Sequence, residues 1–236
     1  MGETMRIQRA LARAGVLSRR KAEELVANNR VTVNGVRAQI GQSVDPENDI
    51  IMVDGEVIGA PSPLEWFVLN KPSGVITSKH DPEGRETVFD FAPKRPGLTY
   101  VGRLDYLTEG VLLLTTDGTM AHKLTHPSHE VERMYEVSVI GDGELAAVAM
   151  KEGVELEDGP VRVQRVTAAK EGRSRWKLTI TIREGRNREI RRLCEAVGLE
   201  VDRLVRVKFG PVELGDLGVG MVRSLTKKEI AALAKL

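Results

Sequence analysis

The stretch GRLDYLTEGVLLLTTDG, residues 102–118, decides how the larger part of this chain folds. Residues 111–116 form an apolar run of strand length, followed by the turn signal Asp117-Gly118, and they predict a buried strand. Asp105 stands on a short polar loop just before that strand. Chemistry concentrates on loops that a rigid scaffold positions. Asp105 is therefore our first candidate for a functional residue.

Length and composition indicate one substantial folded core with a smaller module beside it. The chain has 236 residues, of which 41% are hydrophobic and 29% are charged, and domains usually contain roughly 100–200 residues. The sequence has no run of about 18 apolar residues and no basic start followed by an apolar stretch. Cys194 is the single cysteine, which excludes an internal disulfide and a multi-cysteine metal site. We therefore expect a cytoplasmic protein, with Cys194 as a small buried residue on a helix.

Charge is segregated along the chain, although the formal net charge is only +1. Residues 1–45 carry eight Lys/Arg against four Asp/Glu, and residues 173–208 carry eleven against five. The remainder is acidic, with sixteen Lys/Arg against twenty-five Asp/Glu. Two basic regions on an otherwise acidic chain favour binding to a polyanion such as nucleic acid. A merely solvated charged face is the alternative interpretation.

Residues 1–58 have the pattern of a small compact module. Apolar residues at helical spacing, among them Leu11 and Leu25, predict two short helices. Residues 31–33 then alternate like a strand, and Asn34-Gly35 is a strong hairpin signal. A second strand–turn–strand pattern follows at residues 50–58.

Residues 59–65 contain two prolines and predict a linker, and residues 66–236 form the second predicted domain. Strands are predicted near 75–78, 111–116, 134–140, 161–168, 176–183 and 202–209, and helices near 118–125, 143–151 and 187–197. Strands with occasional helices and no regular alternation favour an α+β fold built on a mainly antiparallel sheet.

The second domain carries four motifs in a fixed order. They are Lys71-Pro72, GRLD at residues 102–105, Tyr135 within VERMYEV, and EGRNREIRR at residues 184–192. This series resembles the pseudouridine synthases, specifically the bacterial ribosomal-RNA branch (the RsuA/RluB-like enzymes). Residues 5–52 resemble the small RNA-binding module first known from a ribosomal small-subunit protein. The resemblance implies an RNA-binding module joined to a catalytic domain, with Lys71 supporting the catalytic loop.

The resemblance also implies roles for individual residues. Asp105 would be the nucleophile that converts a uridine of ribosomal RNA to pseudouridine. Tyr135 would stack on the flipped base, and Ile190 would line the pocket. Arg191 would pair with Asp105, because a buried carboxylate stays ionised only where a cation favours its charged form. Arg103 would reach the phosphates of the flipped nucleotide or fill the place that it vacates.

Two positions depart from the family pattern. Arg188-Glu189 stand where many relatives show His-Gln, and Arg133 stands where relatives often carry lysine. Both departures leave Ile190-Arg191 intact.

Ribosomal RNA in the form of a structured hairpin is the partner that we expect, since RNA recognition usually depends on loops and splayed bases. The cationic side chains expected to bind it are Arg6, Arg19, Arg20, Lys21, Arg37, Arg186 and Arg188. The isomerisation involves no redox change and no group donor, so we expect neither a metal nor an organic cofactor. We also expect a monomer with no membrane partner.

Other interpretations stay open. Three histidines and a glutamate within residues 122–130 could hold zinc, and Asp105 with Glu109 could form the carboxylate pair of a glycosidase. The motifs look closer to enzymes of the large ribosomal subunit, but the same chemistry on small-subunit RNA is an alternative. A non-catalytic RNA-binding factor for ribosome assembly, with the fold retained, is the rival from another class.

Overall fold

The computed structural model describes residues 4–15, 19–59 and 63–236. The chain divides into two compact units. The first comprises Met1–Glu65, Pro93–Thr99 and Thr115–Gly118, and the second comprises Trp66–Ala92, Tyr100–Leu114 and Thr119–Leu236. The predicted division into 1–58, 59–65 and 66–236 stays a prediction, and residues 60–62 of the predicted linker lie outside the described residues.

The first unit contains two short helices and small antiparallel strands. Its elements are β1 (Met5–Arg6), α1 (Ile7–Arg13), α2 (Arg19–Ala27), β2 (Val31–Val33), β3 (Val36–Arg37), β4 (Ser43–Val44), β5 (Ile51–Val53) and β6 (Glu56–Val57). The strands pair in the orders β1-β4 and β3-β2-β5-β6. Ile7, Leu11 and Leu25 meet in one buried cluster, so the predicted helices and their apolar faces are confirmed.

The two tight turns of this unit have the backbone that their sequences predict. Asn34 and Gly35 have φ angles of 51° and 81°, and Asp54 and Gly55 have 53° and 87°. Positive φ at both central residues matches the twist of a two-residue hairpin, and Asn-Gly and Asp-Gly tolerate it best. These turns fix the register of β2 with β3 and of β5 with β6.

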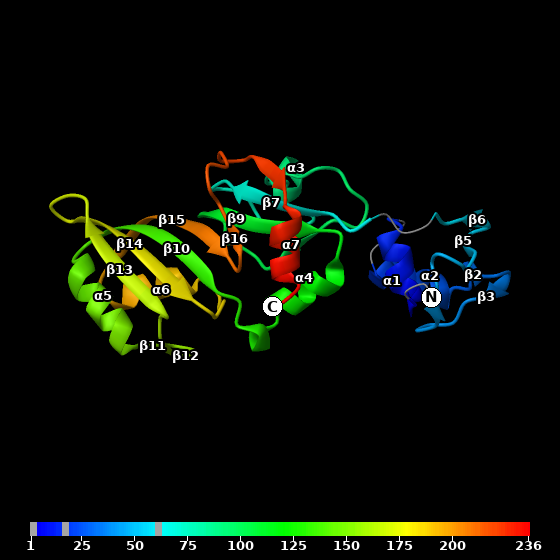
Figure 1. Cartoon of the computed structure of the whole chain (residues 1–236), viewed down its shortest axis with the longest axis horizontal. Helices are drawn as coiled ribbons and strands as arrows, with labels where there is room; N and C mark the ends of the chain where they lie inside the picture. The colour runs from blue at the N-terminus through cyan, green and yellow to red at the C-terminus, as the bar shows by residue number, and fades with distance from the viewer. Residues whose placement is uncertain (1–3, 16–18, 60–62) are drawn as a thin grey trace. The chain divides into compact units, whose positions relative to one another are not determined.

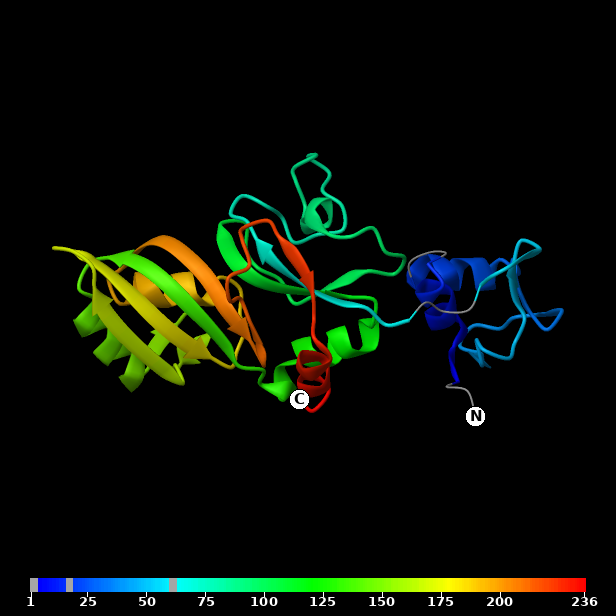
Figure 2. The same cartoon turned by 45° about the horizontal axis from the view of Figure 1, so that its top comes forward.

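The second unit is built on a large sheet. The remaining elements, in chain order, are β7 (Trp66–Lys71), α3 (Val88–Phe91), β8 (Thr99–Val101), β9 (Thr108–Thr115), α4 (Gly118–Thr125), η1 (Pro127–His129), β10 (Arg133–Ile140), α5 (Gly143–Glu152), β11 (Val154–Leu156), β12 (Gly159–Val161), β13 (Arg165–Lys170), β14 (Arg175–Ile182), α6 (Glu189–Ala196), β15 (Glu200–Phe209), β16 (Val212–Glu213), β17 (Val222–Ser224) and α7 (Lys227–Leu233). The main strand order is β13-β14-β10-β15-β9-β7-β17 (Figures 1 and 2). Strands β9 and β15 pair in parallel, whereas the pairs β13–β14, β10–β14, β10–β15 and β7–β17 are antiparallel. The predicted α+β fold with a mainly antiparallel sheet is therefore confirmed.

Residues 111–115 of the predicted apolar run form the C-terminal part of β9, a central strand of this sheet, and Thr116 follows the strand. Val111, Leu112 and Leu114 are completely buried. Helix α5 packs along β13 and β14, and α6 packs along β15 and β11 (Figure 1). In the described ranges, no helix combines the length and apolar character needed to cross a bilayer.

Two strand predictions were wrong. Residues 75–78 do not form a strand, and Ile76 makes only an isolated bridge with Thr87. The backbone of this segment pairs only around Ile76, and the Thr77 side chain bonds to the loop at Leu104. The predicted strand at 161–168 is interrupted, since Val161 ends β12 and Arg165 begins β13.

Gly110 allows β9 and β15 to approach closely beside the site. Its φ is +101°, and an added Cβ would lie 2.2 Å from the backbone oxygen of Arg206.

We expect Gly110→Ala to lower the free energy of unfolding by about 3 kcal/mol, from backbone strain plus this clash. Gly84→Ala is the matched control, because Gly84 has φ +72° with open space around it. In urea unfolding, the control should lower the free energy of unfolding by only about 1 kcal/mol. Equal losses of stability for both variants would contradict the expected clash at Gly110.

Candidate active site

A cavity of about 120 Å³ opens beside Asp105 within the second unit. Its lining residues are Gly102, Arg103, Leu104, Asp105, Thr108, Thr125, Arg133, Tyr135, Ile182, Gly185, Arg186, Arg188, Glu189, Ile190, Leu204, Arg206 and Phe209. The structure thus brings together four of the five predicted site residues, Asp105, Arg103, Tyr135 and Ile190. They come from the loop before β9, from β10 and from α6.

Lys71, at the end of β7, holds the loop that carries Asp105. Its side chain is completely buried. Nζ donates to the carbonyl oxygens of Pro72 at 2.9 Å, Tyr106 at 3.2 Å and Thr108 at 2.9 Å. Burial lowers the pKa of Lys71 to about 8, while the negative charge of Asp105 acts in the opposite direction. One ammonium group therefore fixes the backbone on the C-terminal side of Asp105, as the first motif predicted.

Thr77 holds the other side of the same loop. Its Oγ1 donates to the carbonyl oxygen of Leu104 at 2.9 Å and accepts from the Leu104 amide at 3.3 Å. The loop closes on itself where the Thr108 amide donates to the Asp105 carbonyl oxygen at 3.0 Å. The backbone on both sides of Asp105 is therefore tied to buried or half-buried groups.

Arg191 reaches the catalytic loop from α6. Its side chain is buried, and Nη2 donates to the carbonyl oxygen of Leu107 at 3.1 Å. Burial lowers the pKa of Arg191, nearby Arg188 lowers it further, and the negative charge of Asp105 raises it. Nε of Arg191 is buried without a partner. The two charges interact, but among the described residues the guanidinium bonds to the loop backbone and not to the carboxylate, so the predicted direct pairing stays a prediction.

Tyr135 and Ile190 supply flat and apolar surfaces to the cavity. Tyr135 lies on β10 directly opposite Arg206 of β15, and it is 7% exposed. Ile190 is 4% exposed and belongs to the first turn of α6. Arg103, by contrast, is exposed on the loop next to Asp105.

Among the lining residues that were not predicted as site residues, four carry a charge or an aromatic ring. They are Arg133, Glu189, Arg206 and Phe209. The guanidinium carbons of Arg133 and Arg206 lie 5.5 Å and 5.1 Å from the centre of the Phe209 ring. Alternation along residues 204–209 places Leu204 and Arg206 on one face, so an inward-facing arginine was the signal in the sequence. Which face lines a cavity depends on the pairing with β9 and β10, which the sequence alone does not provide.

Glu189 is a buried carboxyl group at the cavity. Its Oε2 accepts from the Arg186 amide at 3.0 Å, and its Oε1 is buried without a partner. Burial raises the pKa of Glu189. It begins α6 directly after Arg188, whose backbone is left-handed at φ 48°. The Arg188-Glu189 departure from the family pattern therefore changes the wall of the cavity itself.

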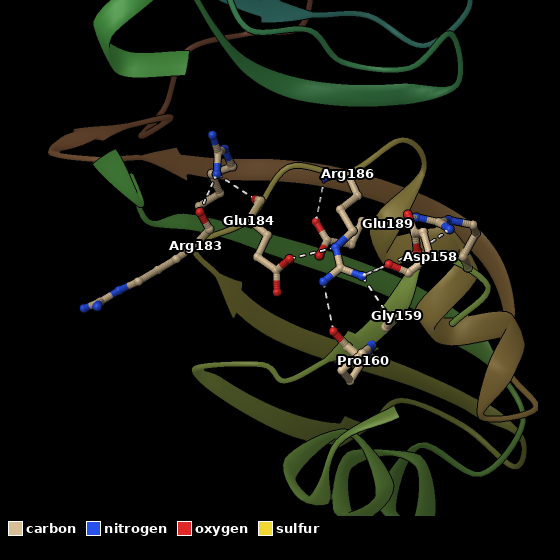
Figure 3. A network of polar contacts seen from close by, with 9 residues as sticks. Asp158, Gly159, Pro160, Arg183, Glu184, Arg186 and Glu189 are labelled. Atoms are coloured by element: carbon tan, nitrogen blue, oxygen red, sulfur yellow. Dashed lines mark hydrogen bonds and ion pairs between the residues drawn. The ribbon is translucent and has the colours of Figure 1, made fainter. Parts of the chain in front are cut away.

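Arg186 is held by acceptors within the protein (Figure 3). Its Nε donates to Glu184 at 2.7 Å, Nη1 donates to the carbonyl oxygen of Gly159 at 3.0 Å, and Nη2 donates to that of Pro160 at 2.9 Å. Arg192 adds two bonds to the Asp158 carboxylate, at 2.9 and 2.8 Å. Arg186 thereby ties the β11–β12 hairpin to the loop before α6. Its contact with RNA stays a prediction, and RNA phosphates would compete with these hydrogen bonds for the guanidinium.

The remaining predicted RNA-binding residues lie on two surfaces. Arg188 is exposed at the cavity and lies 3.8 Å from Glu195. In the first unit, Arg20, Lys21 and Arg37 are exposed. Arg6 is also exposed and donates to the carbonyl oxygen of Gly41. Arg19 begins α2, and its side chain lies outside the described part of the structure.

The alternative chemistries find no support in the geometry. Over the described residues, no group of three or more His, Cys, Asp and Glu side chains is placed to hold a metal ion. His126 instead accepts from the Ser128 amide at the start of η1. Glu109 is not among the residues lining the cavity, and its carboxylate binds Arg203 at 2.9 and 2.7 Å. Cys194 is buried, and burial raises its pKa to about 12, which leaves it unreactive.

Comparison with known proteins shows which family this chain belongs to. The sequence pattern of the RNA pseudouridylate synthase family matches residues 65–196, and that of the S4 domain matches residues 5–51. The chain belongs to the RNA pseudouridylate synthase family, with an S4 domain at its N-terminal side. A solved structure described as a pseudouridylate synthase superimposes with a TM-score of 0.65 at 30% identity, covering 97% of this chain and 99% of the other.

Several relatives with curated names are similar to this chain over most of its length. Ribosomal large subunit pseudouridine synthase B of Pseudomonas aeruginosa is 45% identical over 98% of this chain. The enzyme of the same name from Escherichia coli is 44% identical over 89% of this chain and 75% of its own length. An uncharacterized RNA pseudouridine synthase of Mycobacterium leprae is 40% identical over 98% of this chain and 93% of its own length. The chain spans only 62% of the Pseudomonas protein and 64% of the synthase B of Pasteurella multocida.

Loss of the Lys71 ammonium should release the catalytic loop. We expect Lys71→Met to lower the free energy of unfolding by about 3 kcal/mol, because three carbonyl oxygens lose their donor. Lys151→Met is the control, since Lys151 is exposed in the last turn of α5. Urea unfolding measures both variants; a Lys71→Met protein as stable as the control would contradict this role.

Proposed function

We propose that this protein isomerises uridine to pseudouridine in ribosomal RNA of the large subunit, with Asp105 as the nucleophile. One observation carries the proposal. Asp105 lines a cavity of about 120 Å³, its loop is fixed on both sides, and within the described ranges its carboxylate oxygens have no hydrogen-bond donor. A carboxylate that is held in place and not engaged by the protein is suited to attack a bound ligand.

The cavity has the features that a flipped base requires. Tyr135 offers an aromatic face for stacking, and Ile190 and Leu204 offer apolar contact. The negative charge of Asp105 acts on the Arg191 guanidinium and raises its pKa, against the lowering by burial. Arg103, exposed beside Asp105, is placed to contact the phosphates of the flipped nucleotide. These features support the roles that the family resemblance implies.

The first unit supplies the docking surface in this proposal. Its exposed cations would contact the phosphates of a structured hairpin of ribosomal RNA. The names of the synthase B relatives support the large subunit as the source of that RNA. The protein would act as a monomer in the cytoplasm.

The test is modification of ribosomal RNA in vitro. The protein is incubated with large- and small-subunit transcripts, and pseudouridine is mapped by chemical modification and primer extension. We expect modification at one or a few uridines of the large-subunit transcript. Asp105→Asn should reduce the rate by about 10⁴-fold or more while RNA binding persists. Asp216→Asn, at an exposed position, should leave the rate unchanged.

The outcomes separate the alternatives. Modification of the small-subunit transcript alone would refute the choice of subunit. Binding without modification of either transcript would favour the non-catalytic assembly factor. An Asp105→Asn variant with full activity would remove Asp105 as the nucleophile.

RNA affinity should depend on the cations of the first unit. We expect Arg20→Gln and Arg37→Gln each to weaken binding to the substrate transcript and to reduce the slope of log affinity against log salt by about 1. Arg30→Gln is the matched control, because Arg30 is already paired with Asp54 at 2.7 Å through Nε. The measurement is a filter-binding titration at several salt concentrations. Equal effects of all three variants would contradict a specific docking surface.

A further inference from the structure

Arg206 lies at the cavity wall formed by the sheet. It is 2% exposed, and it belongs to β15 between Leu204 and Phe209. In the register of the sheet it stands directly opposite Tyr135. Directly opposite residues have side chains on the same face, with Cβ atoms about 5 Å apart. The side chain of Arg206 therefore leaves the backbone next to that of Tyr135, whose ring is expected to stack on the substrate base.

Two contacts hold this side chain, and a third holds its backbone. Nε donates to the carbonyl oxygen of Val111 at 2.8 Å. The guanidinium carbon lies 5.1 Å from the centre of the Phe209 ring. The Arg206 backbone packs so closely against Gly110 that no Cβ would fit there. A donor held in this way needs little reorganisation to meet a ligand.

The guanidinium is nevertheless not satisfied by the protein. Nη2 is buried without a hydrogen-bond partner. An arginine cannot lose its charge in a protein, and no ion pair of Arg206 with a carboxylate occurs in the described part of the chain. Arg133 is near enough that the positive charge of Arg206 adds to the lowering of its pKa, which is caused mainly by burial. A buried cation and donor of this kind is costly unless something accepts from it.

We propose that Arg206 binds a carbonyl oxygen of the target uracil and holds the base while it is detached from its ribose. The inference rests on the proposed function. In the isomerisation the Asp105 carboxylate forms a bond to C1′ as the C1′–N1 bond breaks, with its electron pair left on the base and shared between N1 and the carbonyl oxygens. C5 of the base then forms the C1′–C5 bond, and the bond from C1′ to Asp105 breaks with its electron pair returning to the carboxylate. C5 loses a proton and N1 gains one, so nothing is oxidised or reduced. A fixed guanidinium stabilises the base at the stage when its oxygens carry most negative charge.

The depth of Arg206 favours the base over a phosphate as its ligand. The space beside it is about 120 Å³, and its side chain is almost completely enclosed. Phosphates stay with the RNA strand at the mouth of the site, where Arg103 and Arg188 are exposed. Only the flipped base reaches inward.

The experiment pairs enzyme variants with altered substrates. Full-length wild type, Arg206→Lys and Arg206→Met react in single turnover with RNA carrying uridine, 2-thiouridine or 4-thiouridine at the target position. Product is measured by chromatography of nucleosides after digestion. Sulfur accepts hydrogen bonds more weakly than oxygen, so the thio-substitution removes the contact from the substrate side.

We expect Arg206→Met to lower the rate on uridine by about 10²-fold with RNA affinity changed less than about threefold, and Arg206→Lys to recover part of the rate because it keeps the charge. Wild type should be slowed by sulfur at one of the two carbonyl positions. The variant should show no further loss there, because the same contact is already absent. Arg175→Met, at an exposed position of β14, should behave as wild type on every substrate.

Three results would overturn the inference. One is a variant slowed by sulfur as much as wild type at both positions, which indicates a purely structural role. Another is a loss of RNA affinity with a reduced salt dependence, which indicates a phosphate contact. The third is an unchanged rate for Arg206→Met. Wild type inactive on all ribosomal transcripts would instead overturn the proposed function, and this inference with it. Thermal unfolding identifies a variant that fails to fold. If Arg206→Met does not fold, the rates of Arg206→Lys on the uridine and thiouridine substrates test the inference in its place.

Discussion

The candidate active site depends on one buried cation. Lys71 is completely enclosed, and its ammonium donates to three backbone carbonyl oxygens, two of which belong to Tyr106 and Thr108. A buried charge is tolerated only when hydrogen bonds and opposite charge compensate for lost hydration. The carbonyls and the nearby Asp105 provide that compensation. The loop can therefore adopt only conformations that keep the carbonyls on Lys71, and Asp105 is presented in the same place each time.

The rest of the site follows a division between groups that hold the backbone and groups left for a ligand. Thr77 and Arg191 bond to the backbone of the catalytic loop. Within the described residues, Oγ1 of Thr108, Oε1 of Glu189 and Nη2 of Arg206 are buried without partners, and all three residues line the cavity. Unsatisfied buried groups are rare in folded proteins and call for an explanation. A polar ligand in the cavity would give these three groups partners.

Much of this arrangement could be predicted from local sequence. The apolar run at 111–116 became β9, the Asn34-Gly35 turn has the positive φ angles its sequence favours, and the motif order led to Asp105, Tyr135 and Ile190 at one cavity. Arg206 was missed because its position depends on pairing between strands distant in the sequence. The hydrogen bonds of Arg186 could not be predicted, because its acceptors, such as Pro160, come from a distant hairpin. Local patterns carry no information on either partner.

The central claim is that a uridine leaves its RNA helix and enters the cavity beside Asp105. A crystal structure of the protein with a hairpin containing the target uridine, using the Asp105→Asn variant to trap the complex, tests it most directly. The account predicts the target base stacked on Tyr135, with its ribose or ring in contact with the residue-105 side chain. A base that stays stacked in the helix, or that enters the protein away from this cavity, would contradict the account.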